Sequence, residues 1–283
     1  MIRLTRQRTT AIPARYRGAD RIGHEEALLT ARRDQLAAGE GSLGFLKSSM
    51  WKPAKARLEA ETAGKCGYCE AFARNVAHCD VEHIRPKSIY WWLGLCFDNY
   101  VLSCQICNQA PNKLDQYPVT RLLAEPAIRA DTPAARIAAL ANTIAPDPLN
   151  DDAQLTFAEF ERQLRRENPD LIHPYAEDPE PFFVWNVDSV LREVSIAPRA
   201  ARGRAKARAA STIQILGLNR PELLRNRHTT YQPVDTLCQG VRAAIPAALR
   251  ATFEQSLREA MADNHPYAAM NRYVIRVIHG LTI

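Results

Sequence analysis

Two pairs of cysteines have the spacing of a metal site. Cys66 and Cys69 form one CxxC pair, and Cys104 and Cys107 form another. A CxxC pair brings two thiolates within reach of one tetrahedral cation, and four thiolates suit a closed structural zinc site rather than a magnesium site. A single pair could be redox-active, but two pairs that bracket one short segment favour metal binding. The sequence therefore predicts one structural Zn²⁺ bound by these four cysteines.

An acidic residue next to a histidine and two later asparagines lie between and beside these pairs. They are Glu82, His83, Asn99 and Asn108, and the last directly follows Cys107. This combination resembles the pattern of the HNH endonuclease family. The resemblance is closest to the HNH nucleases of retron and Septu-type anti-phage systems. The segments that carry it are 65–70 (KCGYCE), 79–88 (CDVEHIRPKS), 90–93 (YWWL), 98–108, 117–118 and, more weakly, 171–174, 178–180 and 216–227.

The resemblance implies a ββα-metal nuclease fold and a hydrolysis that leaves 5′-phosphate and 3′-hydroxyl ends. It also implies that Asn108 is the second ligand of the catalytic metal, and that Asn99 holds the loop between the strands and orients the histidine. The retron and Septu-type members work beside an ATPase. Because this sequence has no GxxxxGK[ST] phosphate-binding motif, any dependence on ATP is expected to come from a separate partner subunit.

The residue types also suit phosphodiester hydrolysis. The reaction needs a base for the attacking water and a cation on the leaving oxygen. A neutral histidine suits the first task near pH 7, and carboxylate or amide oxygens can hold Mg²⁺ or Mn²⁺ for the second. We therefore expect His83 to be the general base and Glu82 the first metal ligand. Neighbouring side chains point to opposite faces of an ideal strand. Glu82 and His83 can therefore face one phosphate only if the strand twists or bends there. Asp80 is the alternative ligand because it shares a face with Glu82 in a flat strand.

Further basic and aromatic residues in this region are candidates for contacts with nucleic acid. Arg85, Lys87 and Lys113 could bind phosphate or stabilise developing negative charge. Lys113 lies farther from Asn108 than the family places its lysine, which leaves its role open. The aromatic residues 90–92 are expected to pack the nuclease unit on its neighbours, with base stacking as the alternative. No chemistry is assigned to the remaining histidines, which are His24, His78, His173, His228, His265 and His279.

The net charge of +6 is unevenly distributed along the chain. Residues 1–57 and 181–283 each carry a net charge of +7, whereas residues 147–180 carry −7. The densest basic patch lies at residues 199–208, and a polyanion lying against it would relieve its internal repulsion. A solvated helix face is the alternative. DNA is the expected substrate and RNA the alternative, because the chemistry does not reveal the sugar. The patch residues expected to contact nucleic acid are Arg202, Arg204 and Lys206.

The composition is that of an ordinary globular protein, with 46% hydrophobic and 24% charged residues. The apolar run at 89–97 is too short to span a membrane, and the N-terminal residues lack the apolar core of a secretory signal. Seven cysteines, an odd number, favour a reducing compartment over disulfides. We therefore expect a cytoplasmic protein without a membrane partner, in which Cys79, Cys96 and Cys238 are buried thiols.

The expected fold class is helix-rich α+β, with a zinc-bound ββα nuclease core embedded in helical segments. An apolar residue at every fourth position from Val241 to Met261 predicts an amphipathic helix that starts or kinks at Pro246. Further helices are expected at residues 53–63, 134–141, 153–167 and 270–278. The expected regions are a basic extension (1–50), the nuclease core (51–120), a helical accessory region with an acidic loop and a basic patch (121–230) and C-terminal helices (231–283).

The competing hypothesis is a non-catalytic zinc-knuckle module that binds nucleic acid or a protein partner. Both hypotheses predict zinc and basic patches. Only the enzyme requires the side chains of Glu82, His83 and Asn108 to converge on one point.

Overall fold

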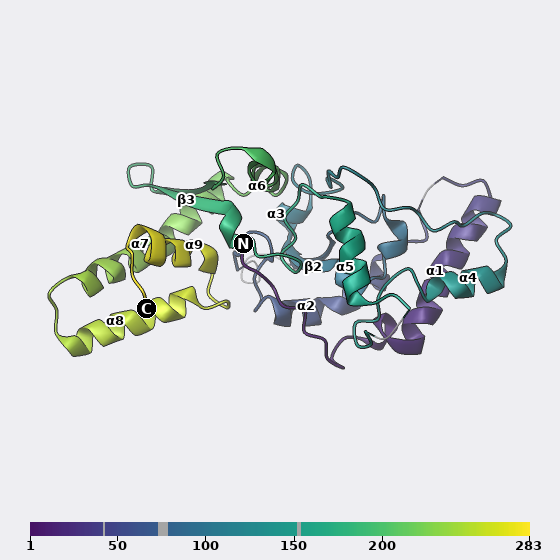
Figure 1. Cartoon of the computed structure of the whole chain (residues 1–283), viewed down its shortest axis with the longest axis horizontal. Helices are drawn as coiled ribbons and strands as arrows, with labels where there is room; N and C mark the ends of the chain where they lie inside the picture. The colour runs from purple at the N-terminus through teal and green to yellow at the C-terminus, as the bar shows by residue number, and fades with distance from the viewer. Residues whose placement is uncertain (42, 73–78, 152–153) are drawn as a thin grey trace.

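The computed structural model describes residues 1–41, 43–72, 79–151 and 154–283, so His78 lies outside the described residues. The chain forms an elongated, helix-rich α+β protein with two small antiparallel sheets (Figure 1), in agreement with the predicted class. The helices are α1 (Gly18–Ala37), α2 (Lys55–Glu61), α3 (Gln105–Asn108), α4 (Ala134–Ala141), α5 (Phe157–Arg166), α6 (Gly203–Ile215), α7 (Pro221–Arg242), α8 (Ala247–Met261) and α9 (Ala268–Tyr273). The strands are β1 (Cys79–His83), β2 (Tyr100–Cys104), β3 (Phe183–Asp188) and β4 (Glu193–Pro198).

Three of the predicted helices form where their boundary residues indicate. Helix α4 begins directly after Pro133, whose fixed φ suits the entry to a helix. Helix α5 begins at the N-cap Thr156, whose side chain accepts a hydrogen bond from the Glu159 amide at 3.1 Å. Helix α2 ends shortly before Gly64, which adopts a positive φ of 75° that glycine tolerates best. These boundaries confirm the predictions near 134–141, 153–167 and 53–63.

The C-terminal apolar stripe belongs to two helices rather than one. Pro246 is the N-cap of α8, so α8 starts there, and Val241 belongs to the end of α7. The two helices pack against each other. Leu257 and Met261 are buried in this contact, whereas Leu249 of the same stripe is exposed. The second stripe, predicted at 270–278, forms α9 and a π-helical extension from Val274 to Ile278.

The hairpin of β3 and β4 was not expected from the sequence. Its register pairs Phe183 with Pro198 and Asp188 with Glu193. Along β3 the side chains of Phe183 and Trp185 are buried and those of alternate residues are less so. This alternation of aromatic and β-branched residues is the signal that would have identified the strand.

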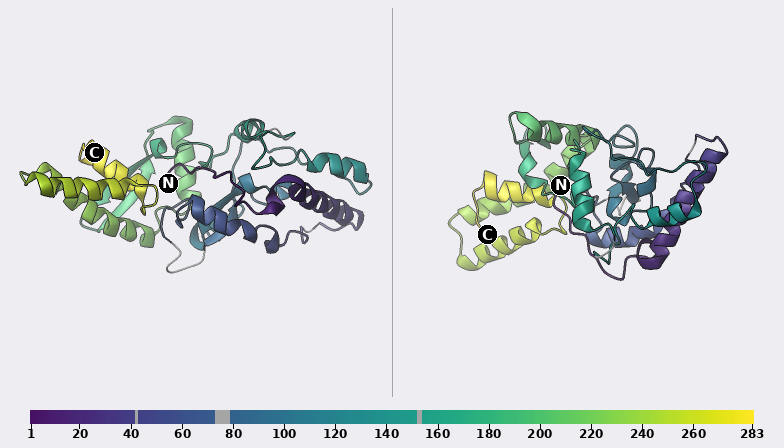
Figure 2. Two further views of the ribbon diagram at one scale, coloured as in Figure 1. Left: turned by 90° about the horizontal axis from the view of Figure 1, so that it is seen from below. Right: turned by 45° about the vertical axis from the view of Figure 1, so that its right-hand side comes forward.

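The first sheet and α3 form a compact unit in which the cysteines and the acid–histidine pair lie together. Strands β1 and β2 are antiparallel, with Cys79 opposite Cys104 at one end and His83 opposite Tyr100 at the other. Helix α3 follows β2 directly and packs against both strands. Figure 2 shows this unit in the middle of the molecule, with α1 and α4 toward one end and α7 and α8 toward the other.

The N-terminal segment packs onto this central unit. Arg6 donates hydrogen bonds to Glu61 at 2.8 Å and to the Tyr100 carbonyl at 2.6 Å, and Arg8 binds Asp98 at 2.8 Å.

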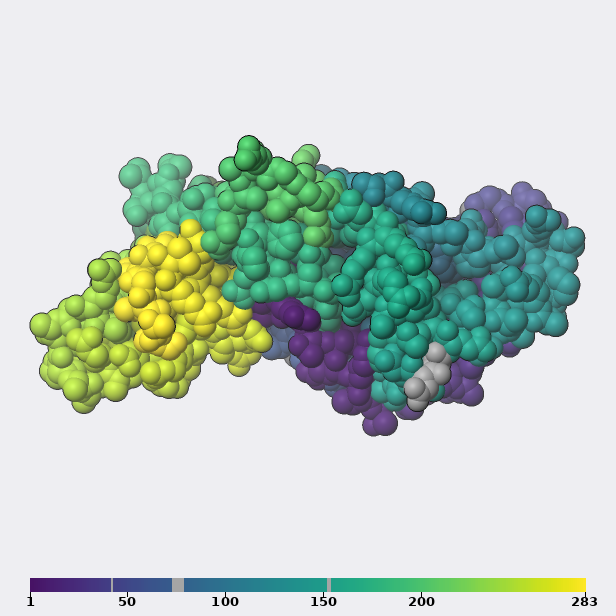
Figure 3. All heavy atoms as spheres, in the orientation of Figure 1, coloured from purple at the N-terminus to yellow at the C-terminus, as the bar shows by residue number. Residues whose placement is uncertain are grey.

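In the space-filling view the C-terminal helices form one end of the molecule (Figure 3). Helix α7 runs through position 230/231, where the sequence suggested a boundary. None of the described helices is long and apolar enough to cross a membrane.

Candidate functional site

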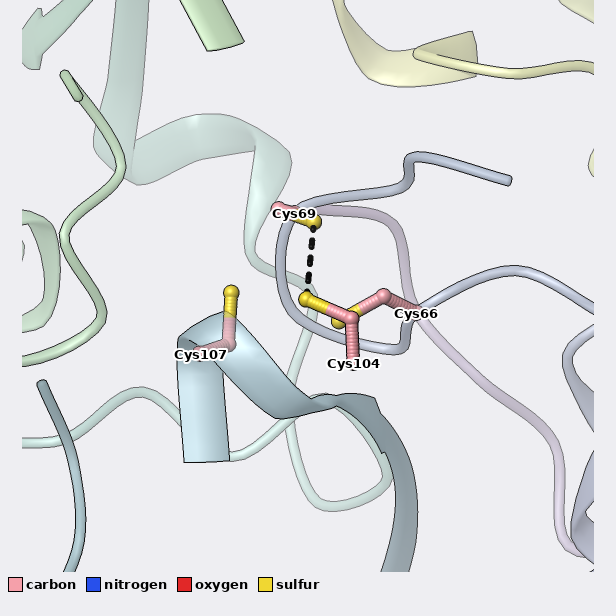
Figure 4. A group of neighbouring side chains, drawn as sticks. All are labelled: Cys66, Cys69, Cys104 and Cys107. Carbon is pink, nitrogen blue, oxygen red and sulfur yellow. Dashed lines mark hydrogen bonds between the residues drawn. The ribbon is translucent and has the colours of Figure 1, made fainter. Parts of the chain in front are cut away.

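The four predicted metal-ligating cysteines meet in the interior. Their sulfur atoms all lie within 4.8 Å of one another, and all four residues are buried (Figure 4). Cys69 and Cys104 are 3.9 Å apart, measured between sulfurs. Zn–S bonds of about 2.3 Å place tetrahedral sulfurs about 3.8 Å apart, so a small contraction would complete the site. The cluster could therefore bind a metal such as zinc.

Backbone hydrogen bonds fix the cysteine positions. The Cys66 turn is closed by a hydrogen bond from the Glu70 amide to the Cys66 carbonyl at 3.0 Å. The Gly67 amide donates to the Leu102 carbonyl at 2.8 Å, which attaches this turn to β2. A Cβ atom at Gly67 would lie 2.6 Å from a methyl group of Val101, so only glycine allows this close approach.

Arg220 supplies a positive charge to the cluster. Its Nη1 donates to the Cys107 sulfur at 3.6 Å and its Nη2 to the Cys69 sulfur at 3.7 Å. Hydrogen bonds from the other three thiols, together with Arg220, hold the pKa of Cys69 well below its usual value. Burial raises the pKa of Cys66 well above its usual value. Sequence reasoning missed Arg220, although it lies in the segment 216–227 that carries the weaker resemblance.

The Glu82 carboxylate is paired with Lys113 in the interior. Both side chains are buried, and they form a direct ion pair. The Lys113 ammonium also donates to the His83 carbonyl at 3.0 Å. Burial raises the pKa of Glu82, and the nearby Lys113 charge opposes that rise. Lys113 therefore neutralises the Glu82 carboxylate in this structure.

The His83 imidazole is buried and held by one of its nitrogens. Its Nε2 lies 3.2 Å from the Gly94 carbonyl, and because a carbonyl can only accept, Nε2 carries the proton. The ring contacts those of Trp51 and Tyr100 edge-on, with centroids 4.9 and 5.0 Å away. Burial lowers the pKa of His83 to about 3. At neutral pH the ring is therefore uncharged, with the lone pair on Nδ1.

The two asparagines differ in their surroundings. Asn99 is buried, and its side chain accepts from the Arg85 amide at 2.9 Å and donates to the carbonyls of Arg85 and Leu93 at 3.0 and 3.4 Å. The Asn108 side chain is half-buried and has no hydrogen bond within the described residues. Asp80, the alternative ligand, accepts a hydrogen bond from Gln109 at 3.5 Å.

The catalytic candidates lie close in the fold but are not joined to one another. Across the described ranges, no hydrogen bond or ion pair links the side chains of Glu82, His83 and Asn108. The structure thus assembles the four sulfurs, whereas Glu82 and His83 bind different partners and the Asn108 side chain has none among the described residues.

The basic candidates are distributed between the interior and the surface. Arg85 and Lys113, both candidates for contacts with phosphate, are buried. The physical reason is that buried carboxylates bind both: Glu167 accepts from Arg85 Nε at 2.6 Å, and Glu82 pairs with Lys113. Lys87 is half-buried, with its ammonium 5.3 Å from the Trp51 ring centroid.

The basic patch is partly neutralised by the acidic loop. Arg204 forms an ion pair with Asp170, and Arg208 forms one with Glu177. Two further candidates of the patch are Arg202 and Lys206. Both are exposed, and neither forms an ion pair with any residue that the structure describes.

No protein-family model matches the chain. One stretch of 69 residues is 33% identical to the Septu protein PtuB of Bacillus mycoides (strain KBAB4). The matched stretch covers 20% of this chain and 23% of that relative. The similarity is therefore confined to one stretch of each chain.

Proposed function

We propose that this chain is a metal-dependent HNH endonuclease that serves an anti-phage defence system. The observation that carries the proposal is the placement of His83 at the end of β1, with its Nε2 bound to the Gly94 carbonyl and a lone pair left on Nδ1. The order β1, β2, α3, the four-cysteine cluster at the end of β2 and the partial similarity to a Septu protein support it.

In the proposed reaction, Nδ1 of His83 accepts a proton from the water that attacks phosphorus. The hydrogen bond of Nε2 to Gly94 keeps the ring in the required tautomer and orientation. Asn99 holds the loop backbone at Arg85 and Leu93 and so fixes the end of β1. A divalent cation bound by oxygens of Glu82 and Asn108 would neutralise charge on the departing 3′-oxygen. The products carry 5′-phosphate and 3′-hydroxyl ends.

Lys113 has a specific place in this scheme. Since its ammonium pairs with Glu82, the carboxylate must exchange that partner for the cation before it can serve as a ligand. The released ammonium can then neutralise a phosphate oxygen. Among the other basic candidates, Lys87, Arg202 and Lys206 are the ones left for contacts with the nucleic-acid backbone.

We further propose a cytoplasmic hetero-complex with a separate ATPase subunit. DNA is the proposed substrate and RNA the alternative. A non-catalytic zinc module is the second candidate function, and two observations favour it: Lys113 already neutralises Glu82, and only 5% of the His83 surface is exposed.

Incubation with nucleic acid separates these functions. Purified protein is incubated with plasmid DNA and with total RNA, in Mg²⁺ or Mn²⁺ and in EDTA. Metal-dependent cleavage that His83→Ala abolishes is the expected result. His228→Ala is the matched control, because His228 is also buried but lies on α7. Cleavage by His83→Ala at the wild-type rate would contradict the catalytic role, and binding without cleavage under all conditions would favour the non-catalytic module.

A further inference from the structure

Cys79 lies beside the four-cysteine cluster but is not one of its members. It is the first residue of β1 and pairs with Cys104, the last residue of β2. Residues directly opposite each other in an antiparallel pair place their side chains on the same face of the sheet. A fifth thiol therefore faces one of the four candidate metal ligands across the strands, and the proposed catalytic scheme does not use it.

The hydrogen bonds around the strand pair show which kind of pair Cys79 and Cys104 form. The Ile84 amide donates to the Asn99 carbonyl at 2.8 Å, directly beyond the ladder, so Ile84 and Asn99 are a hydrogen-bonded pair. Hydrogen-bonded and non-hydrogen-bonded pairs alternate along an antiparallel ladder. The register continues unbroken over the five pairs of the ladder. The fifth of them, Cys79 with Cys104, is therefore a non-hydrogen-bonded pair.

The carbonyl groups at other positions of the ladder agree with this assignment. In a non-hydrogen-bonded pair the carbonyls point away from the opposite strand. The alternation makes His83, Tyr100 and Leu102 members of such pairs. Their carbonyls each accept a hydrogen bond from outside the strand pair, at 3.0, 2.6 and 2.8 Å. Three independent contacts thus give the same alternation.

A non-hydrogen-bonded pair is the closest approach of two strands in an antiparallel sheet. Its Cα atoms are about 4.5 Å apart, against about 5.5 Å in a hydrogen-bonded pair. A disulfide needs Cα atoms about 4.4 to 6.8 Å apart. The backbone at Cys79 and Cys104 therefore has the spacing of a cross-strand disulfide. Both residues are free thiols in this structure, and rotation about their χ1 bonds can join the sulfurs while the strands stay paired.

The two sulfurs differ in their chemistry once a metal is bound. A coordinating thiol is deprotonated, so Cys104 is a thiolate in the metal-loaded cluster, whereas Cys79 lies outside it. The thiolate is the form that reacts with an oxidant. Each of the two residues is only 5% exposed, so the oxidant must be small. Hydrogen peroxide meets this requirement.

We propose that Cys79 is the resolving thiol of Cys104, so that hydrogen peroxide converts the pair into a cross-strand disulfide and opens the metal cluster. The Cys104 thiolate attacks H₂O₂, which releases hydroxide and leaves a sulfenic acid. The Cys79 thiol then attacks this sulfur, the S–O bond breaks and water leaves. The two sulfurs together lose two electrons, which reduce one H₂O₂.

The disulfide changes the metal site reversibly. Only three thiolates remain for the metal, so the cluster binds it less tightly. Thiol reductants cleave a disulfide, whereas oxidation of a sulfenic acid to a sulfinic acid is generally irreversible. Because the strands stay paired, reduction returns Cys104 to its place in the cluster. This proposal does not depend on the nuclease activity.

Oxidation of the zinc-loaded full chain tests the proposal. The protein is treated with H₂O₂, the remaining thiols are alkylated under denaturing conditions, and mass spectrometry of the digest identifies the linked cysteines. A chromogenic chelator measures the released zinc in parallel. We expect one link between Cys79 and Cys104 for each zinc ion released. Dithiothreitol should remove the link and restore zinc binding.

Two variants separate the resolving role from general oxidation. Cys79→Ser keeps all four cysteines of the cluster and should bind zinc like the wild type. After H₂O₂ and dithiothreitol, its recovery of zinc binding should be lower by about threefold or more, because its Cys104 sulfenic acid proceeds to the sulfinic acid. Cys238→Ser is the matched control, since Cys238 is also buried and outside the cluster but lies on α7. It should behave like the wild type.

Three results would overturn the proposal. The first is zinc release with disulfides only among the four cysteines of the cluster, which would give the resolving role to a metal ligand. The second is equal recovery of zinc binding in Cys79→Ser, Cys238→Ser and the wild type. The third is retention of zinc, with Cys79 and Cys104 both reduced, at a concentration of H₂O₂ that oxidises the half-buried Met50. If Cys79→Ser fails to fold, the links found in the wild-type digest decide.

Discussion

The two ends of the β1–β2 pair differ in how far their polar groups have come together. At the end where Cys79 faces Cys104, four sulfurs lie within 4.8 Å of one another. At the other end, where His83 faces Tyr100, Glu82 is paired with Lys113 and His83 with the Gly94 carbonyl. At the first end the chain alone brings the four sulfurs together. At the second end Glu82 and His83 each bind another group of the protein and not each other.

The difference follows from how each site is constrained. The CxxC turns fix each cysteine pair locally, and Gly67 binds one turn directly to β2. The catalytic candidates come from β1 and α3, and only Glu82 among them is charged. Without a cation, its buried carboxylate needs another positive group. Lys113 serves as that group. The comparison teaches that the cysteine cluster is already assembled in the fold, whereas the proposed catalytic arrangement would require a change of partner at Glu82.

The largest expected effect is at the cysteine end. Cys66→Ser should remove the bound zinc and unfold the β1–β2–α3 unit, because metal binding contributes directly to the folding free energy of such sites. Zinc content by elemental analysis and circular dichroism measure the effect. Cys79→Ser is the control, since Cys79 is buried on the same strand pair but is not one of the four. A Cys66→Ser protein that stays folded without zinc would contradict the claim that the cysteine cluster holds the β1–β2–α3 unit together.

The Glu82–Lys113 pair should show the next largest effect. Lys113→Met leaves the buried carboxylate without its cation, and such losses cost about 3–5 kcal/mol of unfolding free energy. The double variant Lys113→Met/Glu82→Gln should recover much of this loss, because no unpaired charge remains. Urea unfolding of both variants provides the measurement. Equal stabilities for the single variant and the wild type would show that the pair does not form in solution.

Acid should destabilise the catalytic end through His83. The unfolded chain protonates this histidine below about pH 6.5, whereas in the folded protein its pKa is lowered to about 3. The unfolded state thus binds more protons in this window, so stability falls as the pH falls, by about 2–3 kcal/mol between pH 6.5 and 4.5.

The comparison of wild type with His83→Gln isolates this contribution. Glutamine keeps a donor for Gly94 but does not titrate, and effects of other groups, such as Glu25 with its pKa raised to about 8 by burial, cancel in the difference. The difference in unfolding free energy between the two proteins should change with pH in that window. A constant difference would contradict a lowered pKa for His83.

The two asparagines should respond differently to alanine. Asn99→Ala removes buried hydrogen bonds to Arg85 and Leu93 and should cost about 1–3 kcal/mol. Asn108→Ala should change stability by less than about 0.5 kcal/mol, because its side chain has no partner among the described residues. Asn108→Ala should nevertheless weaken Mn²⁺ binding, measured by calorimetry. Unchanged Mn²⁺ affinity would remove Asn108 from the proposed ligand set.

The smallest expected effect concerns the basic patch. Arg202 and Lys206 are exposed and without ion pairs in the described chain, whereas Arg204 is paired with Asp170. Replacing Arg202 and Lys206 by Gln should reduce the slope of log affinity for DNA against log salt by about 2. Arg204→Gln should change that slope less. Identical salt slopes for all these proteins would make the patch a solvated face.

Local patterns explain most of what the sequence predicted. Pro133 and the alanine-rich run place α4, and the two CxxC pairs identify the four cysteines that meet in the fold. These features depend on spacing within a few residues. The β3–β4 hairpin also had a local signal, the alternation of buried and less buried residues at Phe183 and Trp185.

Contacts between segments that are far apart along the chain could not be predicted from the sequence. Nothing near His173 shows that folding places it beside Arg85 and Tyr117. Likewise, the burial of Lys113 depends on the Glu82 carboxylate of β1, 31 residues earlier in the chain. Such groups gain their chemistry only from tertiary neighbours, so spacing along the chain gives no indication of it.

The contact of Arg220 with the cluster has a consequence for the order of events during synthesis. The last of the four cysteines is Cys107, and Arg220 follows 113 residues later, which corresponds to roughly 6–23 s of translation at typical rates. A metal ion can therefore enter the cluster while the chain for α7 is still unmade. Arg220, the N-cap of α7, is then made after the thiolates that its guanidinium contacts, so early metal binding at the cluster would help to place the start of α7.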